Sequence, residues 1–428
     1  MSKLIPLWIR RQLSSYAPET IRNISLLMSG SLVATLVPLI TSPINTRLYS
    51  PHHYGVWGII TAVATLLGIL AFSHLPNTIL LAKEEDEAKR ALWLSVFFNA
   101  TICFLFVIVL CVLLFFIKTG VLQWEFLHPL YLLIPVITFV NGLNVIIAVW
   151  ANRKKQYKSI SANRIIQICV GTGLQILLGL LIANETGIVV SQLVGACVGL
   201  WYFFIIFRKD IGPLYFNGPV FRKILKEYKD LIKFSLPADV INNFSNQIPV
   251  FFLERLVGTS AVGLYNMSNR ILSLSVSYIT SSISEVFRQK ATRQYHDTGS
   301  CRPLVVRTAK TLFLVSIVPF LLCLWFAPDI FAFVFGAEWR QAGSYARLIG
   351  ILFLFKTIFS PVSFVLFISK QFKVSFIMDV VVLITSMLSL YIGIVVFGSP
   401  EVALLLYACN YGLLYFVTFY LSYKYAVR

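Results

Sequence analysis

Four cationic side chains lie in or beside long apolar segments of the chain, where a fixed positive charge is costly. They are Arg47, Arg255, Arg270 and Lys356. The planar fork of an arginine donates two charge-assisted hydrogen bonds to a phosphate or pyrophosphate. We therefore expect these groups to bind an anionic substrate in a cavity. The alternative for Arg47 and Arg255, which each end an apolar segment, is that they anchor a helix end at the outer headgroups.

Polar side chains at helical spacing accompany the cations. Asp239, Asn242, Asn243, Asn246 and Gln247 fall at offsets of 0, 3, 4, 7 and 8 residues, which places them on one face of a helix. A polar face is costly in lipid, so it should line the interior of a bundle, where amides and hydroxyls can bind sugar hydroxyls. The predicted polar cavity residues are Asn45, Asn242, Asn243, Asn246, Gln247 and Ser277.

Two carboxylates in apolar segments, Asp239 and Asp379, are candidates for coupling transport to an ion. The alternative is that each belongs to an internal ion pair. The sequence contains no Gly-rich phosphate loop and no HExxH or GxSxG motif, and its seven cysteines show no metal spacing. We therefore expect no enzymatic activity, no metal site and no cofactor. A proton gradient, a sodium gradient or the membrane potential would supply the energy.

An internal repeat organises the chain. Thr46-Arg47-Leu48, six residues, then Gly55-Val56-Trp57 returns as Glu254-Arg255-Leu256, six residues, then Gly263-Leu264-Tyr265. The offset is 208 residues, close to half of the 428-residue chain. In both copies the arginine ends one apolar segment and the glycine opens the next. This pattern indicates two related halves, each with an arginine at the mouth of its first hairpin.

The composition is that of an integral membrane protein. Apolar residues make up 58% of the chain and charged residues 13%, whereas a soluble domain carries roughly 25% charged residues. Runs of about 20 apolar residues each have the length of one membrane span. The predicted spans are 24–44, 54–73, 92–117, 129–149, 165–183, 188–207, 234–253, 263–284, 311–334, 346–368, 374–396 and 401–421.

The distribution of the 36 Lys and Arg residues predicts the orientation. Most of them lie at the two termini and in alternate connections between spans. This bias follows the positive-inside rule, so both termini should be cytoplasmic. The net charge of +18 is then a consequence of topology, and nucleic acid is not expected as a partner.

The twelve spans predict two lobes joined by a linker. Residues 1–207 would form the N-terminal six-helix lobe and residues 234–428 the C-terminal six-helix lobe. The linker, 208–233, carries apolar residues at helical spacing against a basic face from Phe221 to Lys233. This pattern is typical of an amphipathic helix lying at the cytoplasmic membrane surface.

The first copy of the repeat also resembles a family signature. TSPINTRLYSPHHYG, residues 41–55, resembles the TRLYxPxxYG sequence that opens bacterial polysaccharide transporters. ILLAKEEDEA, residues 79–88, resembles their AILLAKxxxEA stretch. The chain is thus similar to the O-antigen flippases (Wzx-like) of the polysaccharide transporter family, within the multidrug/oligosaccharidyl-lipid/polysaccharide (MOP) exporter superfamily.

This resemblance implies an all-α membrane fold of two six-helix lobes in a V shape that opens alternately to each face. The implied substrate is an undecaprenyl-pyrophosphate-linked oligosaccharide, moved from the cytoplasmic to the periplasmic leaflet of the bacterial inner membrane. Arg47 and Arg255 match the theme of cavity-lining arginines in related flippases, whereas Arg270 and Lys356 rest on their positions alone. The implied partners are the bilayer, the lipid-linked glycan, and the polymerase and chain-length regulator of the same pathway.

Three other functions fit parts of the pattern. A cation-coupled multidrug exporter of the same superfamily would favour acidic and aromatic cavity groups, whereas here the charges are mixed. A polysaccharide polymerase or ligase would need a sizeable outer loop to hold its acceptor, and the predicted outer loops are short. In a non-transporting scaffold, the polar stripes would only hold helices together.

Overall fold

The computed structural model describes the backbone of residues 18–72, 74–118, 128–212, 218, 221 and 236–427. Side chains are described for all of these except residues 18–29, 31–32, 117–118, 275, 277–279 and 281–282. The expected helix in the linker falls almost wholly outside the described residues.

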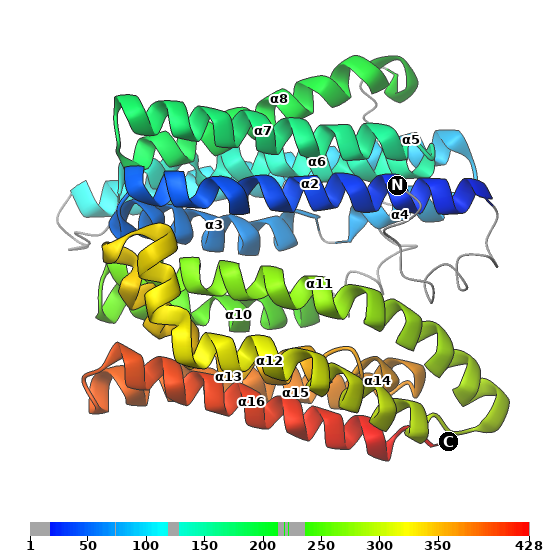
Figure 1. The fold of residues 1–428 in the computed structure, drawn as a ribbon. Helices are drawn as coiled ribbons and strands as arrows, with labels where there is room; N and C mark the ends of the chain where they lie inside the picture. The colour runs from blue at the N-terminus through cyan, green and yellow to red at the C-terminus, as the bar shows by residue number, and fades with distance from the viewer. Residues whose placement is uncertain are drawn as a thin grey trace. The chain divides into compact units, whose positions relative to one another are not determined.

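The described chain is helical apart from short connections (Figure 1). Its long helices, of 20 to 40 residues, each overlap one predicted span. They are α2 (Pro18–Leu48), α3 (Pro51–Phe72), α5 (Glu85–Lys118), α6 (Ile134–Arg153), α7 (Tyr157–Leu181), α8 (Glu185–Ile211), α10 (Leu236–Leu256), α11 (Thr259–Thr298), α12 (Arg302–Phe335), α13 (Arg340–Phe359), α15 (Phe372–Tyr391) and α16 (Pro400–Lys424). Short helices α4 (Leu75–Leu81) and α14 (Phe364–Ile368) lie between them.

Nine helices of the described residues are long and apolar enough to cross a membrane. The long helices outside that group are α2, α10 and α11, and the polar stripes singled out in the sequence lie on these helices. The all-helical membrane fold expected from the sequence is therefore confirmed. The three least apolar long helices are the ones that carry the polar residues noted in the sequence.

The tenth predicted span, 346–368, is not one continuous helix. α13 ends at Phe359, and α14 begins only at Phe364. The cause is Pro361, which has no N–H to donate to the carbonyl of Thr357, four residues earlier. Ser360, the last residue before it, still has helical backbone angles.

α2 is continuous although it contains Pro43, because side chains satisfy the carbonyl that the proline leaves free. Pro43 cannot donate to the carbonyl of Leu39, four residues earlier. The Ser42 hydroxyl donates to that oxygen instead, at 2.6 Å. The helix continues past Pro43 because the freed acceptor has a new donor.

The chain divides into two compact units. One comprises residues 1–42 and 67–233, and the other comprises residues 43–66 and 234–428. The second unit therefore includes the first copy of the repeat motif together with the second copy. The lobe boundaries at 207 and 234 stay a prediction.

In the first unit, a buried amide cluster joins α6, α7 and α8. Asn144 of α6 donates from Nδ2 to the carbonyl of Ala196 at 3.0 Å. Its Oδ1 accepts from Gln167 Nε2 at 3.0 Å and from Asn163 Nδ2 at 3.3 Å, both on α7. Hydrogen bonds between side chains and neighbouring helices hold membrane bundles together where the hydrophobic effect cannot. Sequence analysis singled out none of these three residues.

Arg153 at the end of α6 fixes the connection between α4 and α5. Its Nη1 donates to the carbonyls of Ile79 and Ala82 at 2.8 and 2.7 Å, and its Nη2 donates to the carbonyl of Glu84 at 3.2 Å. The carbonyls of Ile79 and Ala82 lie at the end of α4, where a helix runs out of its own donors, so a guanidinium is a suitable cap. The carbonyl of Glu84, just before α5, also accepts from the Ala88 N–H at 3.1 Å.

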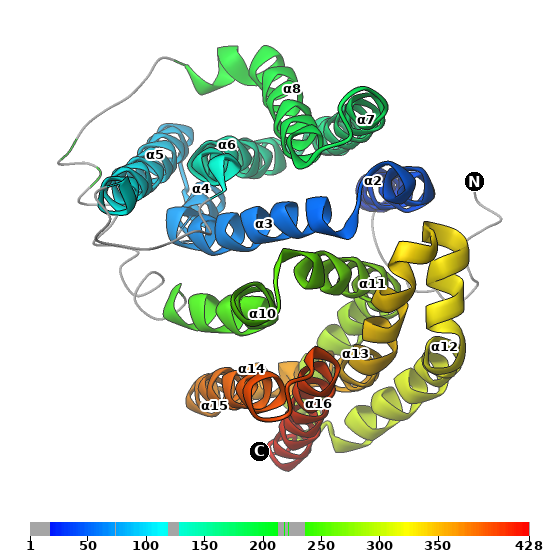
Figure 2. The same cartoon turned by 90° about the vertical axis from the view of Figure 1, so that its left-hand side faces the viewer.

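In the second unit, α13 packs against both α12 and α16 (Figure 2). α10 packs against α15, and α11 packs against α13. This arrangement brings polar faces of α10, α11, α13, α15 and α16 together inside one unit, which is where the candidate site lies.

Candidate functional site

Two adjoining polar cavities lie inside the second unit, with volumes of about 200 and 350 Å³. They have in common Asn246, Lys356, Tyr411 and Tyr415. We call the smaller one the tyrosine cavity and the larger one the hydroxyl cavity. Lys356, predicted as a cavity cation from its place in an apolar segment, lines both.

The ammonium of Lys356 has no ion-pair partner among the described carboxylates, and its Nζ lies 5.7 Å from the centre of the Phe353 ring. A desolvated ammonium gains from the face of an aromatic ring, but far less than from an anion. The side chain is half-buried. A fixed cation in a polar cavity, next to an aromatic face and without a carboxylate partner, is suited to bind an anionic ligand.

The tyrosine cavity is lined by α10, α11, α13 and α16. α10 contributes Asn243, Asn246 and Gln247 from the predicted polar face, and α11 contributes Asn269 and Ser273. Tyr265 of α11 and Tyr407 of α16 also line this cavity. Amides and phenols that line one cavity can exchange hydrogen bonds with sugar hydroxyls, and the rings offer apolar faces to sugar carbons.

A ladder of tyrosines on α16 is the feature that sequence analysis missed. Tyr407, Tyr411 and Tyr415 recur every four residues, with ring centres 5.1 and 5.8 Å apart. The spacing was visible in the sequence, but α16 also carries many other aromatic residues, so this face did not stand out.

The hydroxyl cavity contains Asp379 in addition to Lys356. Asn242 donates from Nδ2 to Asp379 Oδ1 at 3.3 Å. Ser360, Ser363, Ser375 and Thr418 also line this cavity. Asp239 lies in the first turn of α10, where the Asn243 amide donates to its backbone carbonyl at 2.8 Å.

The predicted arginines do not line these cavities. Arg47 and Arg255 are exposed in the last turns of α2 and α10, and Arg270 is exposed on α11. Their binding of substrate stays a prediction. Asn45 is buried, and its Oδ1 has no hydrogen-bond partner among the described residues. The side chain of Ser277 lies outside the described residues.

The two copies of the repeat motif cross each other within the second unit. A side chain on Gly55 would collide with the carbonyl of Thr259, and one on Gly263 with the carbonyl of Pro51. Gly263 and Thr259 are the positions 208 residues after Gly55 and Pro51. The contacts are therefore reciprocal, as in a two-fold interface, and only glycine permits so close an approach. We call this contact the α3–α11 crossing.

Trp339, in a short turn before α13, holds the crossing together. It is fully buried, and its Nε1 donates to the carbonyl of Thr46, in the last turn of α2, at 3.0 Å. Its ring meets that of Tyr54 edge to face, with centres 5.2 Å apart. Burial raises the pKa of the neighbouring Tyr49 to about 12, so that phenol stays protonated.

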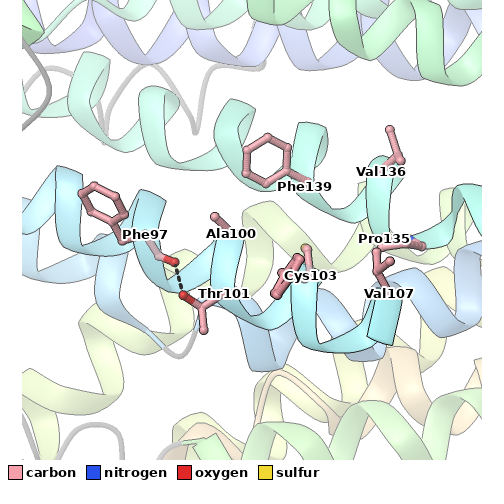
Figure 3. Close-up of a pocket in the computed structure, with 9 residues that line it drawn as sticks. Phe97, Ala100, Thr101, Cys103, Val107, Pro135, Val136 and Phe139 are labelled. Atoms are coloured by element: carbon pink, nitrogen blue, oxygen red, sulfur yellow. Dashed lines mark hydrogen bonds between the residues drawn. The ribbon is translucent and has the colours of Figure 1, made fainter. Parts of the chain in front are cut away.

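An apolar groove in the first unit shows that size alone does not locate the site. It has a volume of about 560 Å³ between α5 and α6 and includes Phe97, Phe139 and Pro135 (Figure 3). The hydroxyl of Thr101 donates to the carbonyl of Phe97 at 2.8 Å. No charged side chain lines the groove, so it can hold an apolar chain but not a polar ligand.

Comparison with known proteins agrees with this architecture. The structure matches the lipid II flippase MurJ in an inward closed conformation, with a TM-score of 0.72 and 15% identity, over 93% of this chain and 87% of that one. A family model described as polysaccharide biosynthesis protein matches residues 20–287.

Two curated relatives are similar in sequence. The chain is 23% identical to an uncharacterized membrane protein in the cps region of Klebsiella pneumoniae, over 83% of this chain and 73% of that protein. It is also 23% identical to the succinoglycan biosynthesis transport protein ExoT of Rhizobium meliloti, over 76% of this chain and 63% of that protein.

The fold is that of the lipid II flippase MurJ, and it is also similar to a multidrug resistance MATE family transporter of the MOP superfamily, with a TM-score of 0.60 and 15% identity, over 94% of this chain and 97% of that one. More narrowly, the chain belongs to the polysaccharide biosynthesis protein family, as its sequence motifs had indicated.

Proposed function

We propose that the protein is a flippase for undecaprenyl-pyrophosphate-linked oligosaccharide units of O-antigen or a related surface polysaccharide. It would move them from the cytoplasmic to the periplasmic leaflet of the bacterial inner membrane, with both of its termini cytoplasmic. The polymerase and the chain-length regulator of the pathway are its proposed partners.

One observation carries the proposal: Lys356 lies beside an aromatic ring in cavities lined by amides, hydroxyls and tyrosines. Pyrophosphate and sugars cannot cross about 30 Å of hydrocarbon without replacement of their hydration. The cation replaces hydration at an anionic group, and the amides and phenols replace it at hydroxyls. The lipid chain needs no such replacement and stays in the membrane.

The energy for net movement has two proposed sources. With the cell interior negative, outward transfer of each negative charge is favoured by roughly 2.3 kcal/mol per 100 mV. Asp239 and Asp379 are the proposed ion-coupling groups, and Asp379 already accepts a hydrogen bond from Asn242 beside Lys356. Release of the α3–α11 crossing would open the cavity to the outer face.

The test is to delete the gene in its own host and to locate the lipid-linked repeat units. We expect single units to accumulate on the inner leaflet, with loss of the surface polymer. The wild-type gene should restore the polymer, and so should Lys373→Met, which removes an exposed lysine at the start of α15. Lys356→Met, with a similar unbranched side chain but no charge, should fail at equal expression.

Other outcomes identify the rival functions. If single units reach the outer leaflet and remain unpolymerised, the protein is the polymerase. If the polymer is normal and the cells become sensitive to cationic dyes, it is a drug exporter. If Lys356→Met restores the polymer as well as the wild type does, the cavity is not the substrate site.

A further inference from the structure

A separate apolar slot lies beside the tyrosine cavity, on the other side of α13. It has a volume of about 280 Å³ and is formed by α11, α12 and α13. Phe320, Phe331 and Leu354 are among its walls, and no charged residue lines it. We call it the α11–α13 slot.

The polar atoms of the slot are already used. The Ser316 hydroxyl donates to the carbonyl of Leu312 at 2.7 Å, and the Thr357 hydroxyl donates to the carbonyl of Phe353 at 2.7 Å. The Cys323 thiol lies 3.6 Å from the carbonyl of Ala346. A water molecule in a cavity needs two to four polar partners. These groups therefore leave the slot dry and suited to a hydrocarbon chain.

Phe353 is the wall between the slot and the tyrosine cavity, because its side chain lines both. The ring is 4% exposed, and the Lys356 ammonium lies on its cavity side, 5.7 Å from the ring centre. A fixed cation and a dry apolar space are thus separated by one aromatic side chain. A molecule with an anionic group joined directly to a hydrocarbon chain matches this pair of sites.

The slot lies close to the lipid-facing surface of the unit. Leu322 and Ile330 both line it, and their side chains are 52% and 47% exposed. Large apolar side chains with that exposure, on a helix that spans the membrane, face lipid. A chain can therefore enter the slot sideways from the bilayer.

We propose that the α11–α13 slot binds the part of the prenyl chain next to the pyrophosphate of the lipid-linked substrate. The pyrophosphate lies at Lys356, and the Phe353 ring moves aside to let the chain pass between the two sites. This inference rests on the proposed function, which it deepens by naming where the lipid portion is held.

The test uses a photo-reactive benzophenone amino acid in place of Phe320, which lines the slot. A matched control carries it in place of Leu314, which is 59% exposed on the same helix and outside the slot. The probe is radiolabelled undecaprenyl pyrophosphate in proteoliposomes. We expect labelling at position 320 at least tenfold above that at position 314, with competition by unlabelled probe and none by phosphatidylglycerol.

A second variant tests occupancy of the slot without disturbing the fold. A Cβ at Gly350 would lie 3.6 Å from Cys323 Sγ and 3.7 Å from the Phe320 ring, which are ordinary contacts. Gly350→Ala should leave the labelling nearly unchanged, whereas Gly350→Leu should fill the slot and reduce labelling at position 320 at least fivefold. Thermal unfolding of both variants checks that they fold.

Equal labelling at both positions, or competition by phosphatidylglycerol, would show that the slot holds only bulk lipid and would overturn the inference. Flipping of lipid-linked units by the wild type in the same vesicles tests the proposed function separately. If units are flipped but position 320 is not labelled, the proposed prenyl site in the slot is wrong and the proposed function stands. If position 320 is labelled but units are not flipped, the proposed function is wrong and the slot is a prenyl-binding site only.

Discussion

Replacement of Trp339 by Phe tests whether the α3–α11 crossing opens during transport. The change keeps the aromatic contact with Tyr54 but removes the hydrogen bond from the indole to the carbonyl of Thr46. Loss of one such hydrogen bond costs about 0.5–1.5 kcal/mol. If that cost falls on the closed crossing alone, the population in which it is open rises roughly 2- to 12-fold.

The assay measures access to the tyrosine cavity from outside the cell. A single cysteine at Asn269, in a background without the seven native cysteines, reports the rate of modification by a membrane-impermeant maleimide. We expect Trp339→Phe to raise that rate by the factor above. Trp201→Phe, which alters an exposed side chain on α8, should leave it unchanged.

The reasoning is refuted if Trp339→Phe lowers the thermal unfolding temperature while the modification rate stays at the wild-type value. That result would mean that the indole stabilises the unit in every state. A raised rate at an unchanged unfolding temperature would mean that the hydrogen bond belongs to one state of the transport cycle.

Two further substitutions test the packing that surrounds the site. Arg153→Ala should lower the thermal unfolding temperature, since the carbonyls of Ile79 and Ala82 lose a charge-assisted donor at about 1.5–3 kcal/mol each. Lys158→Ala, at an exposed position on α7, is the control, and an unfolding midpoint of Arg153→Ala equal to that of the wild type would show that water replaces the bonds. Gly263→Leu would place a side chain on a backbone carbonyl across the crossing, so maleimide modification of the Asn269→Cys reporter should rise. Gly173→Leu, where no atom lies near the added Cβ, should have no effect, and an unchanged rate in Gly263→Leu would show that the crossing is not a barrier.

The sequence predicted the fold because hydropathy and charge bias act over whole segments. Each apolar run became a helix, since lipid leaves a backbone no other way to satisfy its hydrogen bonds. The errors were local. Pro361 ended α13 early, and the amides of Asn144 and Asn163 join helices in a region where the sequence analysis singled out no polar residue.

The candidate site was predictable only in part. Lys356 and the amides of α10 were found because charge and amide groups are rare in membrane helices, so each one stands out. The tyrosines of α16 were missed because aromatic residues are common there and serve as packing and as interfacial anchors. Which of them share a cavity depends on how helices far apart in the chain pack, and no local pattern carries that information.

In the repeat motif, the glycines have a clear structural role, whereas the arginines first drew attention to the motif. Its arginines suggested paired cations, but neither lines the polar cavities, and both end their helices at the surface. Its glycines, by contrast, occupy reciprocal contacts where any side chain would strike a backbone carbonyl. Such a crossing requires the same six-residue interval in both copies, because a shift of one residue in either copy would move its glycine off the contact.

The recurrence is therefore explained by the packing of α3 on α11, and a role for Arg47 and Arg255 in substrate binding needs its own evidence. Arg47→Gln with Arg255→Gln supplies it: unchanged surface polymer at equal expression would assign both arginines to anchoring helix ends.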